Sequence, residues 1–140
     1  MKKLPIVLFG ATFAVIVTVI AMFVIINNNT VDLRIVKDAS YFSDYYVEDE
    51  KVYIKCEVTI RNFSSVNESF QLNAILKDDV ELGLLKSENL KGYSQELSND
   101  KFTVEKKTTK TFSVVFVGDF AGINRKQDRN LPEIVITTIE

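Results

Sequence analysis

Two kinds of hydrophobic pattern divide the chain. Residues 4–26, LPIVLFGATFAVIVTVIAMFVII, contain no charged side chain, whereas from residue 31 onward apolar and polar positions alternate in short runs. An unbroken apolar run suits a helix in lipid, because a helix satisfies every backbone amide within one segment. Alternation with a period of two is typical of strands that bury one face. The pattern predicts one N-terminal transmembrane helix followed by an all-β domain.

The apolar run is long enough to cross a membrane. As a helix, its 23 residues would extend about 34 Å, against a hydrocarbon core of about 30 Å. A cleaved signal peptide is the alternative, because Val19 and Ala21 form a V-x-A site. Five further apolar residues follow that site, however, which favours an uncleaved span. We therefore expect residues 4–26 to be a transmembrane anchor.

Charge around the anchor predicts its direction. Lys2 and Lys3 precede it, and basic residues beside a span favour the cytoplasmic side. We expect residues 1–3 to form a cytoplasmic tail, residues 27–30 a polar linker, and residues 31–140 an extracytoplasmic domain. The expected localisation is the cell membrane, with a single pass, the N-terminus in the cytoplasm and the C-terminal domain outside.

The region after residue 30 predicts about seven short strands. The clearest is 51–61, in which five apolar side chains alternate with polar ones: Val52, Ile54, Cys56, Val58 and Ile60. The other expected strands are 31–35, 69–77, 80–85, 102–104, 109–117 and 134–139. Residues 77–79 are expected to turn the chain, and residues 86–100 to form a loop. Short strands separated by turns favour a two-sheet β-sandwich over a closed barrel.

Three runs resemble small immunoglobulin-like domains that are tethered to Gram-positive cell membranes. They are VYIKCEVTIRNFSS, SFQLNAILKDDVELG and FTVEKKTTKTFSVVFVGDFAG, and the resemblance covers most of residues 31–139. It implies an immunoglobulin-like β-sandwich that acts as a binding or accessory module. The chain departs from antibody domains, because Cys56 has no partner cysteine and the chain has no tryptophan for the core.

Composition argues against several classes of function. The chain has no histidine and one cysteine, which excludes Ser-His-Asp and Cys-His catalysis and histidine metal sites. Cys56 falls on the apolar face of its strand and is expected to be a buried core residue. Of the 17 Lys and Arg residues two precede the anchor, which leaves 15 against 19 Asp and Glu after it, a net charge of −4. A mildly acidic domain argues against nucleic acid as a partner.

Two segments are candidate partner contacts. A tyrosine-rich connection between the first two expected strands suits protein or glycan recognition, because tyrosine combines apolar area with a polar tip: Tyr41, Phe42, Tyr45 and Tyr46. A basic loop within 118–130 suits lipid head groups, cell-wall polymer or an acidic partner: Arg125, Lys126 and Arg129. The alternatives are that the aromatic residues complete the core and that the loop is simply solvated.

Two acidic clusters, Glu48–Glu50 and Asp78–Asp79, are expected to be solvated turns, since neither has the spacing of a calcium-binding EF-hand. We therefore expect no metal and no other cofactor. The chain is expected to be a non-enzymatic binding or accessory module at the outer face of a bacterial membrane, with a protein or cell-wall partner. A structural subunit of a larger membrane or cell-envelope complex and a carboxylate-based cell-envelope enzyme are the alternatives.

Overall fold

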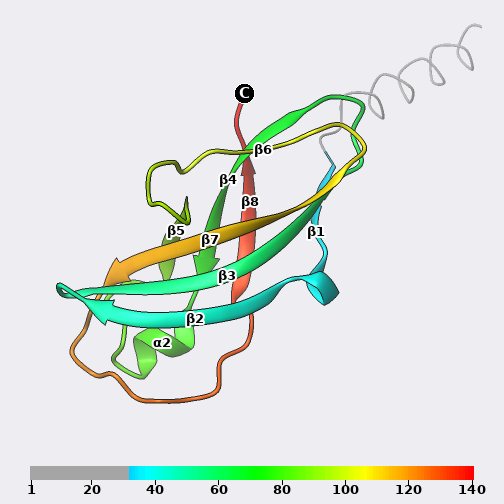
Figure 1. The fold of residues 1–140 in the computed structure, drawn as a ribbon. Helices are drawn as coiled ribbons and strands as arrows, with labels where there is room; N and C mark the ends of the chain where they lie inside the picture. Colours follow the sequence, from blue (N-terminus) through cyan, green and yellow to red (C-terminus); the bar gives the residue numbers. More distant parts are fainter. Residues whose placement is uncertain (1–31) are drawn as a thin grey trace, which may run out of the picture. The chain divides into compact units, whose positions relative to one another are not determined.

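The computed structural model describes residues 32–140, so the expected tail, anchor and linker lie outside the described residues. Residues 32–140 form an all-β domain of eight antiparallel strands, which confirms the predicted all-β class (Figure 1). Two strands are new and one of the expected seven is absent from this range. Within this range no helix is both long and apolar enough to span a membrane.

The strands are joined mostly by short turns. Their bounds are β1 Leu33–Ile35, β2 Tyr41–Glu48, β3 Lys51–Asn62, β4 Glu68–Ile75, β5 Asn89–Ser94, β6 Phe102–Val104, β7 Thr109–Asp119 and β8 Glu133–Thr138. A 3₁₀ turn, η1, spans Lys37–Ala39, and a short helix, α2, spans Lys77–Glu81. Two connections of 13 residues are the longest: residues 76–88, which contain α2, and residues 120–132, between β7 and β8.

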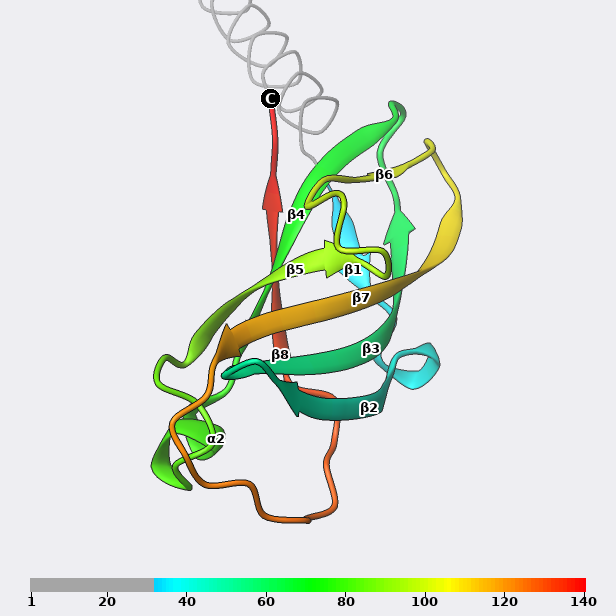
Figure 2. The ribbon, with the colours of Figure 1, turned by 60° about the vertical axis from the view of Figure 1, so that its left-hand side comes forward.

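All eight strands belong to one hydrogen-bonded sheet, not to the two separate sheets that the sequence predicts. The pairing order is β1-β3-β7-β5-β4-β6, with β2 also paired to β3 and β8 to β4. In Figures 1 and 2, β2, β3 and β7 lie side by side, and β4 and β8 run steeply across them. β5 connects these halves, because Lys91 pairs with Val117 of β7 on one side and with Asn73 of β4 on the other.

The core lies between the two halves of the sheet. The apolar residues of β3 that alternation identifies, from Val52 to Ile60, are each at most 1% exposed, and Cys56 is buried among them as predicted. Phe70 of β4 packs edge-on against Phe112 of β7, with ring centroids 5.6 Å apart. Burial of this alternating face supplies the hydrophobic stabilisation of the domain.

Two expected elements are replaced by others. Residues 80–85 do not form a strand, because α2 begins at Lys77 and the carbonyl of Asp79 accepts the amides of Leu84 and Leu85 at 2.9 and 3.1 Å. Gly83 has a φ of +80°, a conformation that favours glycine and lets the chain reverse there. The expected loop 86–100 contains β5, a strand that the polar residues around it conceal.

The tyrosine-rich connection is also a strand. β2 pairs with β3 from Tyr41 to Glu48, and a bulge between Phe42 and Asp44 shifts the register. The turn that follows consists of Asp49 and Glu50, both with positive φ, as a tight two-residue hairpin requires. The aromatic side chains of this segment therefore project from the two faces of an edge strand.

The domain has two ends with different structures. At the first, which we call the entry pole, residue 32 meets the loop 63–67 and the turn 105–108: the amide of Phe63 donates to the carbonyl of Asp32, and that of Asn62 to the carbonyl of Thr108, both at 2.9 Å. This end lies at the top of Figures 1 and 2. At the other end, the lower one in both views, lie α2 and the segment 120–132.

Candidate binding cavity

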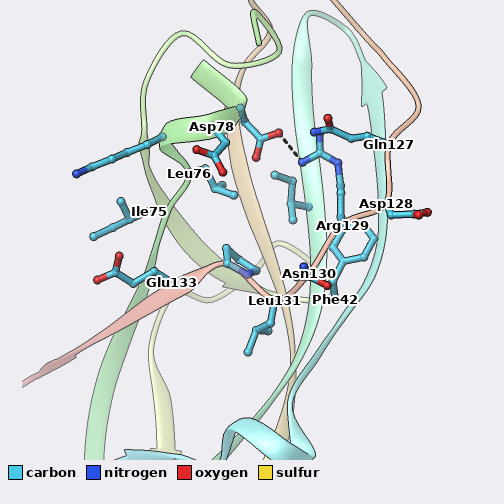
Figure 3. A pocket seen from close by; sticks show the side chains of 14 residues that line it. Phe42, Ile75, Leu76, Asp78, Gln127, Asp128, Arg129, Asn130, Leu131 and Glu133 are labelled. Atoms are coloured by element: carbon cyan, nitrogen blue, oxygen red, sulfur yellow. Dashed lines mark ion pairs between the residues drawn. The ribbon is translucent and has the colours of Figure 1, made fainter. Parts of the chain in front are cut away.

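A cavity of about 390 Å³ lies at the end of the domain opposite the entry pole (Figure 3). β2 and β3 form one side of it, and the end of β4 together with α2 forms the other. The segment 127–133 completes the wall. The cavity thus lies where the two halves of the sheet diverge and the segment 120–132 bridges them.

The lining combines apolar walls with charged groups. The apolar side chains come from all of the contributing elements: Phe42, Ile54, Ile75, Leu76, Leu131 and Pro132. The charged ones are two cations and four carboxylates: Lys77, Arg129, Asp78, Asp79, Asp128 and Glu133. In Figure 3 Asp78 and Glu133 lie on the α2 and β8 side, opposite Arg129 and Phe42, while Asp128 points away from the cavity. Polar and charged groups supply most of the exposed lining, and the apolar side chains lie between them.

A buried ion pair supports the cavity wall. Nη1 of Arg129 lies 2.5 Å from Oδ1 of Asp79, and the two side chains are only 8% and 6% exposed. The contact is close, but it is not aligned as a hydrogen bond. Within residues 32–140, Oδ1 of Asp79 has no hydrogen-bond partner, and neither has Nε of Arg129. Coulombic attraction therefore holds this pair, which links α2 to the 120–132 segment.

An aromatic residue of β2 fixes the same segment from the other side. The guanidinium carbon of Arg129 lies 4.4 Å from the ring centroid of Tyr45, a cation–π contact. The hydroxyl of Tyr45 lies 2.8 Å from Oδ1 of Asn124 and 3.1 Å from the carbonyl of Arg125. Tyr45 thus holds the segment across the edge strand, and Arg129 is enclosed between an aromatic ring and a carboxylate.

The structure brings together four of the seven predicted contact residues. Phe42 lines the cavity, Tyr45 and Arg129 pack against each other, and the backbone of Arg125 accepts the Tyr45 hydroxyl. The other three lie elsewhere. Tyr41 is 58% exposed, Tyr46 stacks on Tyr53 with centroids 4.7 Å apart, and Lys126 is exposed and does not line the cavity.

The acidic clusters behave differently from each other. Glu48–Glu50 is an exposed hairpin turn, as expected. Asp79 is buried, so the expectation that Asp78–Asp79 is a solvated turn is wrong for one of its two residues. Its partner, Arg129, is likewise not a side chain of a solvated loop. Within residues 32–140 no group of three or more potential metal ligands comes together.

Comparison with known proteins identifies no relative of this chain. No family model matches it, and neither a curated protein nor a solved structure is significantly similar to it. The resemblance to immunoglobulin-like domains therefore stays a prediction from the sequence. The cavity has to be interpreted from its own geometry and charge.

Proposed function

We propose that the chain is a non-enzymatic binding module, tethered to the outer face of a bacterial membrane by residues 4–26, and that its cavity receives a Lys or Arg side chain of a protein partner. The observation that carries this proposal is the composition of the cavity. Its apolar walls suit the aliphatic stem of a long basic side chain, and its carboxylates suit the charged head.

Charge supports a cationic ligand. Arg129 is already paired with Asp79, so its charge is neutralised within the wall. Lys77 then remains as the single cation of the lining against Asp78 and Glu133, the two unpaired carboxylates that face the cavity. An excess of carboxylates in a cleft with apolar walls attracts positive groups and speeds their association.

The position of the cavity supports a role in capture. A tether that joins the domain at residue 32 is attached at the entry pole, and the cavity opens at the opposite end. Such an arrangement leaves the cavity accessible to partners in the surrounding medium.

An immunoglobulin-like sandwich remains our proposal for the fold family. Support comes from the antiparallel pairing of all strands and from the face-to-face packing of β4 on β7 across an aromatic core. The continuous hydrogen bonding through β5 is a departure from two separate sheets. This part of the proposal concerns ancestry and does not affect the function of the cavity.

Photo-crosslinking in intact cells tests the function. A photoreactive amino acid at Asn130, an exposed residue of the cavity wall, is expected to capture one discrete protein partner. Reversing the charge of the lining with Asp78→Lys and Glu133→Lys should abolish that product, because two carboxylates that face the ligand become repulsive cations.

The matched control reverses the charge of two carboxylates outside the cavity. Asp38→Lys with Glu96→Lys alters two exposed carboxylates that do not line the cavity, and the crosslinked product should persist. A product that survives the Asp78 and Glu133 substitutions would show that the cavity does not take a basic side chain. Capture of a small molecule instead of a protein would contradict the proposed class of partner.

A further inference from the structure

The entry pole gathers basic side chains from three separate segments. Arg34 of β1 pairs with Arg61 of β3, and Arg61 pairs on its other side with Thr109 at the start of β7. Lys106 and Lys107 lie in the turn before β7, and Lys110 lies near its start. All five cations are exposed: Arg34, Arg61, Lys106, Lys107 and Lys110.

Three of these cations contact one exposed aromatic residue, Phe63. The guanidinium carbons of Arg34 and Arg61 lie 5.0 and 4.7 Å from the ring centroid of Phe63, and Nζ of Lys107 donates to the carbonyl of the same residue. Phe63 is 36% exposed, and Val66 in the same loop is 56% exposed. Cations around exposed apolar side chains match the layered chemistry of a lipid surface, where head groups cover hydrocarbon.

The loop that carries these side chains is fixed in place. The buried amide of Asn62 donates to the carbonyls of Val66 and Val104 at 2.8 and 3.3 Å, and its oxygen accepts the amide of Ser64 at 2.9 Å. Asn67 accepts the amide of Lys106 at 2.9 Å. The hydrophobic and the basic components of the entry pole are therefore presented together as one preformed surface.

Charge separates this pole from the rest of the domain. The five cations stand against four carboxylates there, Asp32, Glu68, Glu105 and Glu140, and Glu68 is buried. The domain after the predicted anchor nevertheless carries a net charge of −4, so the rest of it is acidic while this pole has an excess of cations. A domain polarised in this way orients in front of a negative surface with its basic end toward it.

The entry pole follows the predicted membrane span closely in the sequence. Five residues separate Ile26 from Asp32, and a chain of that length reaches at most about 20 Å. Attraction between charges in physiological salt extends over about 8 Å, and a tether this short allows the pole to approach the lipid surface within that distance.

We propose that the entry pole docks on the head groups of an anionic lipid bilayer, with Arg34, Arg61, Lys106 and Lys107 contacting phosphates and Phe63 and Val66 entering the interface. The inference rests on the proposed anchoring of the chain. Docking holds the domain in one orientation, so that the cavity faces away from the bilayer. The tether and the docked pole act as two membrane signals on one chain.

Spin labelling of the full chain in lipid nanodiscs tests the docking. A nitroxide is placed at Ser65→Cys in the entry pole or at Ala121→Cys near the cavity, and its depth is measured by relaxation with oxygen and with a water-soluble nickel chelate. Burial raises the pKa of the native Cys56 thiol to about 12, so this thiol does not take the label at neutral pH.

The expected result depends on lipid charge. In discs containing phosphatidylglycerol the label at residue 65 should report head-group depth, and it should move to water in phosphatidylcholine discs or at high salt. The label at residue 121 should stay in water throughout. Arg61→Glu with Lys107→Glu should lose the lipid-dependent shift, whereas Lys77→Glu with Lys126→Glu, the same charge change at the other end, should keep it.

Each contrary outcome has a separate meaning. A label at residue 65 that stays in water in anionic discs, on a chain that has incorporated, overturns the docking and leaves the anchor intact. Failure of the chain to incorporate at all refutes the anchor itself. A shift caused by soluble polyphosphate but not by anionic lipid assigns the pole to a phosphate polymer and also overturns the proposal. Should Arg61→Glu with Lys107→Glu prevent folding, the salt series on the wild-type chain decides the question.

Discussion

At the scale of single residues, the pair of Asp79 and Arg129 has the largest energetic consequence. Both side chains are more than nine-tenths buried, so each has lost its hydration, and neither is aligned with the other as a hydrogen bond. Removing one charge of such a pair leaves the other without compensation in a medium of low dielectric constant. The exposed pair of Asp32 and Arg34 is chemically similar but remains solvated, with side chains 39% and 68% exposed.

We expect Asp79→Asn to lower the free energy of unfolding by about 3–5 kcal/mol, because Arg129 stays charged and buried. Asp32→Asn, the control, should change it by no more than about 1 kcal/mol. The double variant Asp79→Leu with Arg129→Met should recover most of the lost stability, since no isolated charge remains. Urea unfolding of the three variants measures these differences, and equal effects of Asp79→Asn and Asp32→Asn would contradict the importance of burial.

The sequence could not reveal this pair. Asp79 adjoins Asp78 in a polar run, and Arg129 adjoins Asp128 in another, so composition assigns both to solvated turns. They meet because residues 77–81 form the helix α2 and because the segment 120–132 crosses the end of the sheet beside it. By contrast, burial of Cys56 was predictable, because a single strand with five matching positions fixes which face points inward.

At the scale of elements, β5 determines how the two halves of the sheet are joined. Its centre is Gly92, where a β-carbon would lie 2.9 Å from the side chains of Phe116 and Val114 and 3.0 Å from the carbonyl of Leu72. Real β-carbons essentially never lie closer than 3.0 Å to another atom, so the strand fits without adjustment only because this position lacks a side chain. β5 therefore depends on a residue that strand propensities disfavour, which explains why it escaped prediction.

We expect Gly92→Ala to lower the free energy of unfolding by about 1–3 kcal/mol, because the added methyl group overpacks a core that has no space for it. Gly92→Val should cost more. Ser94→Ala, in the same strand, has no such contact to disturb and serves as the control. Denaturant midpoints measure the series, and a Gly92→Ala variant as stable as the wild type would show that β5 can move away from β7 at little cost.

Elements with regular alternation were predictable, and elements without it were not. β3 follows the expected alternation along most of its length, because one of its faces is buried and the other is partly solvated. β7 departs from it at its centre, where Val114, Val115 and Phe116 are all buried. The sequence predicts a connection where β2 lies, because the aromatic residues there do not alternate cleanly with polar ones. The bulge between Phe42 and Asp44 is the physical reason for this irregular pattern.

At the scale of the whole domain, the sheet depends on pairing between segments that are far apart in the sequence. β8 pairs with β4 over six positions, from Phe70 with Thr138 to Ile75 with Glu133. Ile134 and Ile136 of β8 also cover the core. Periodicity identifies strands but not their partners, so the all-β class was predictable and the single continuous sheet was not.

We expect a chain that ends at residue 130 to lose the cooperative unfolding transition of the full domain, because β4 then keeps strand partners on only one of its two edges and the core is uncovered. A chain that lacks only Glu140 should unfold like the wild type, since this residue lies beyond β8. Circular dichroism during thermal unfolding distinguishes the two truncations. A cooperative transition in the shorter chain would mean that β4 and β5 suffice to close the sheet.

The pairing of β8 with β4 also sets the order of events during synthesis. A chain that leaves the ribosome from its N-terminus contains β4 long before the strand that completes it, and non-local pairing of this kind is slow. The sheet therefore closes only after β8 has left the ribosome. Until then one edge of β4 has no strand beside it.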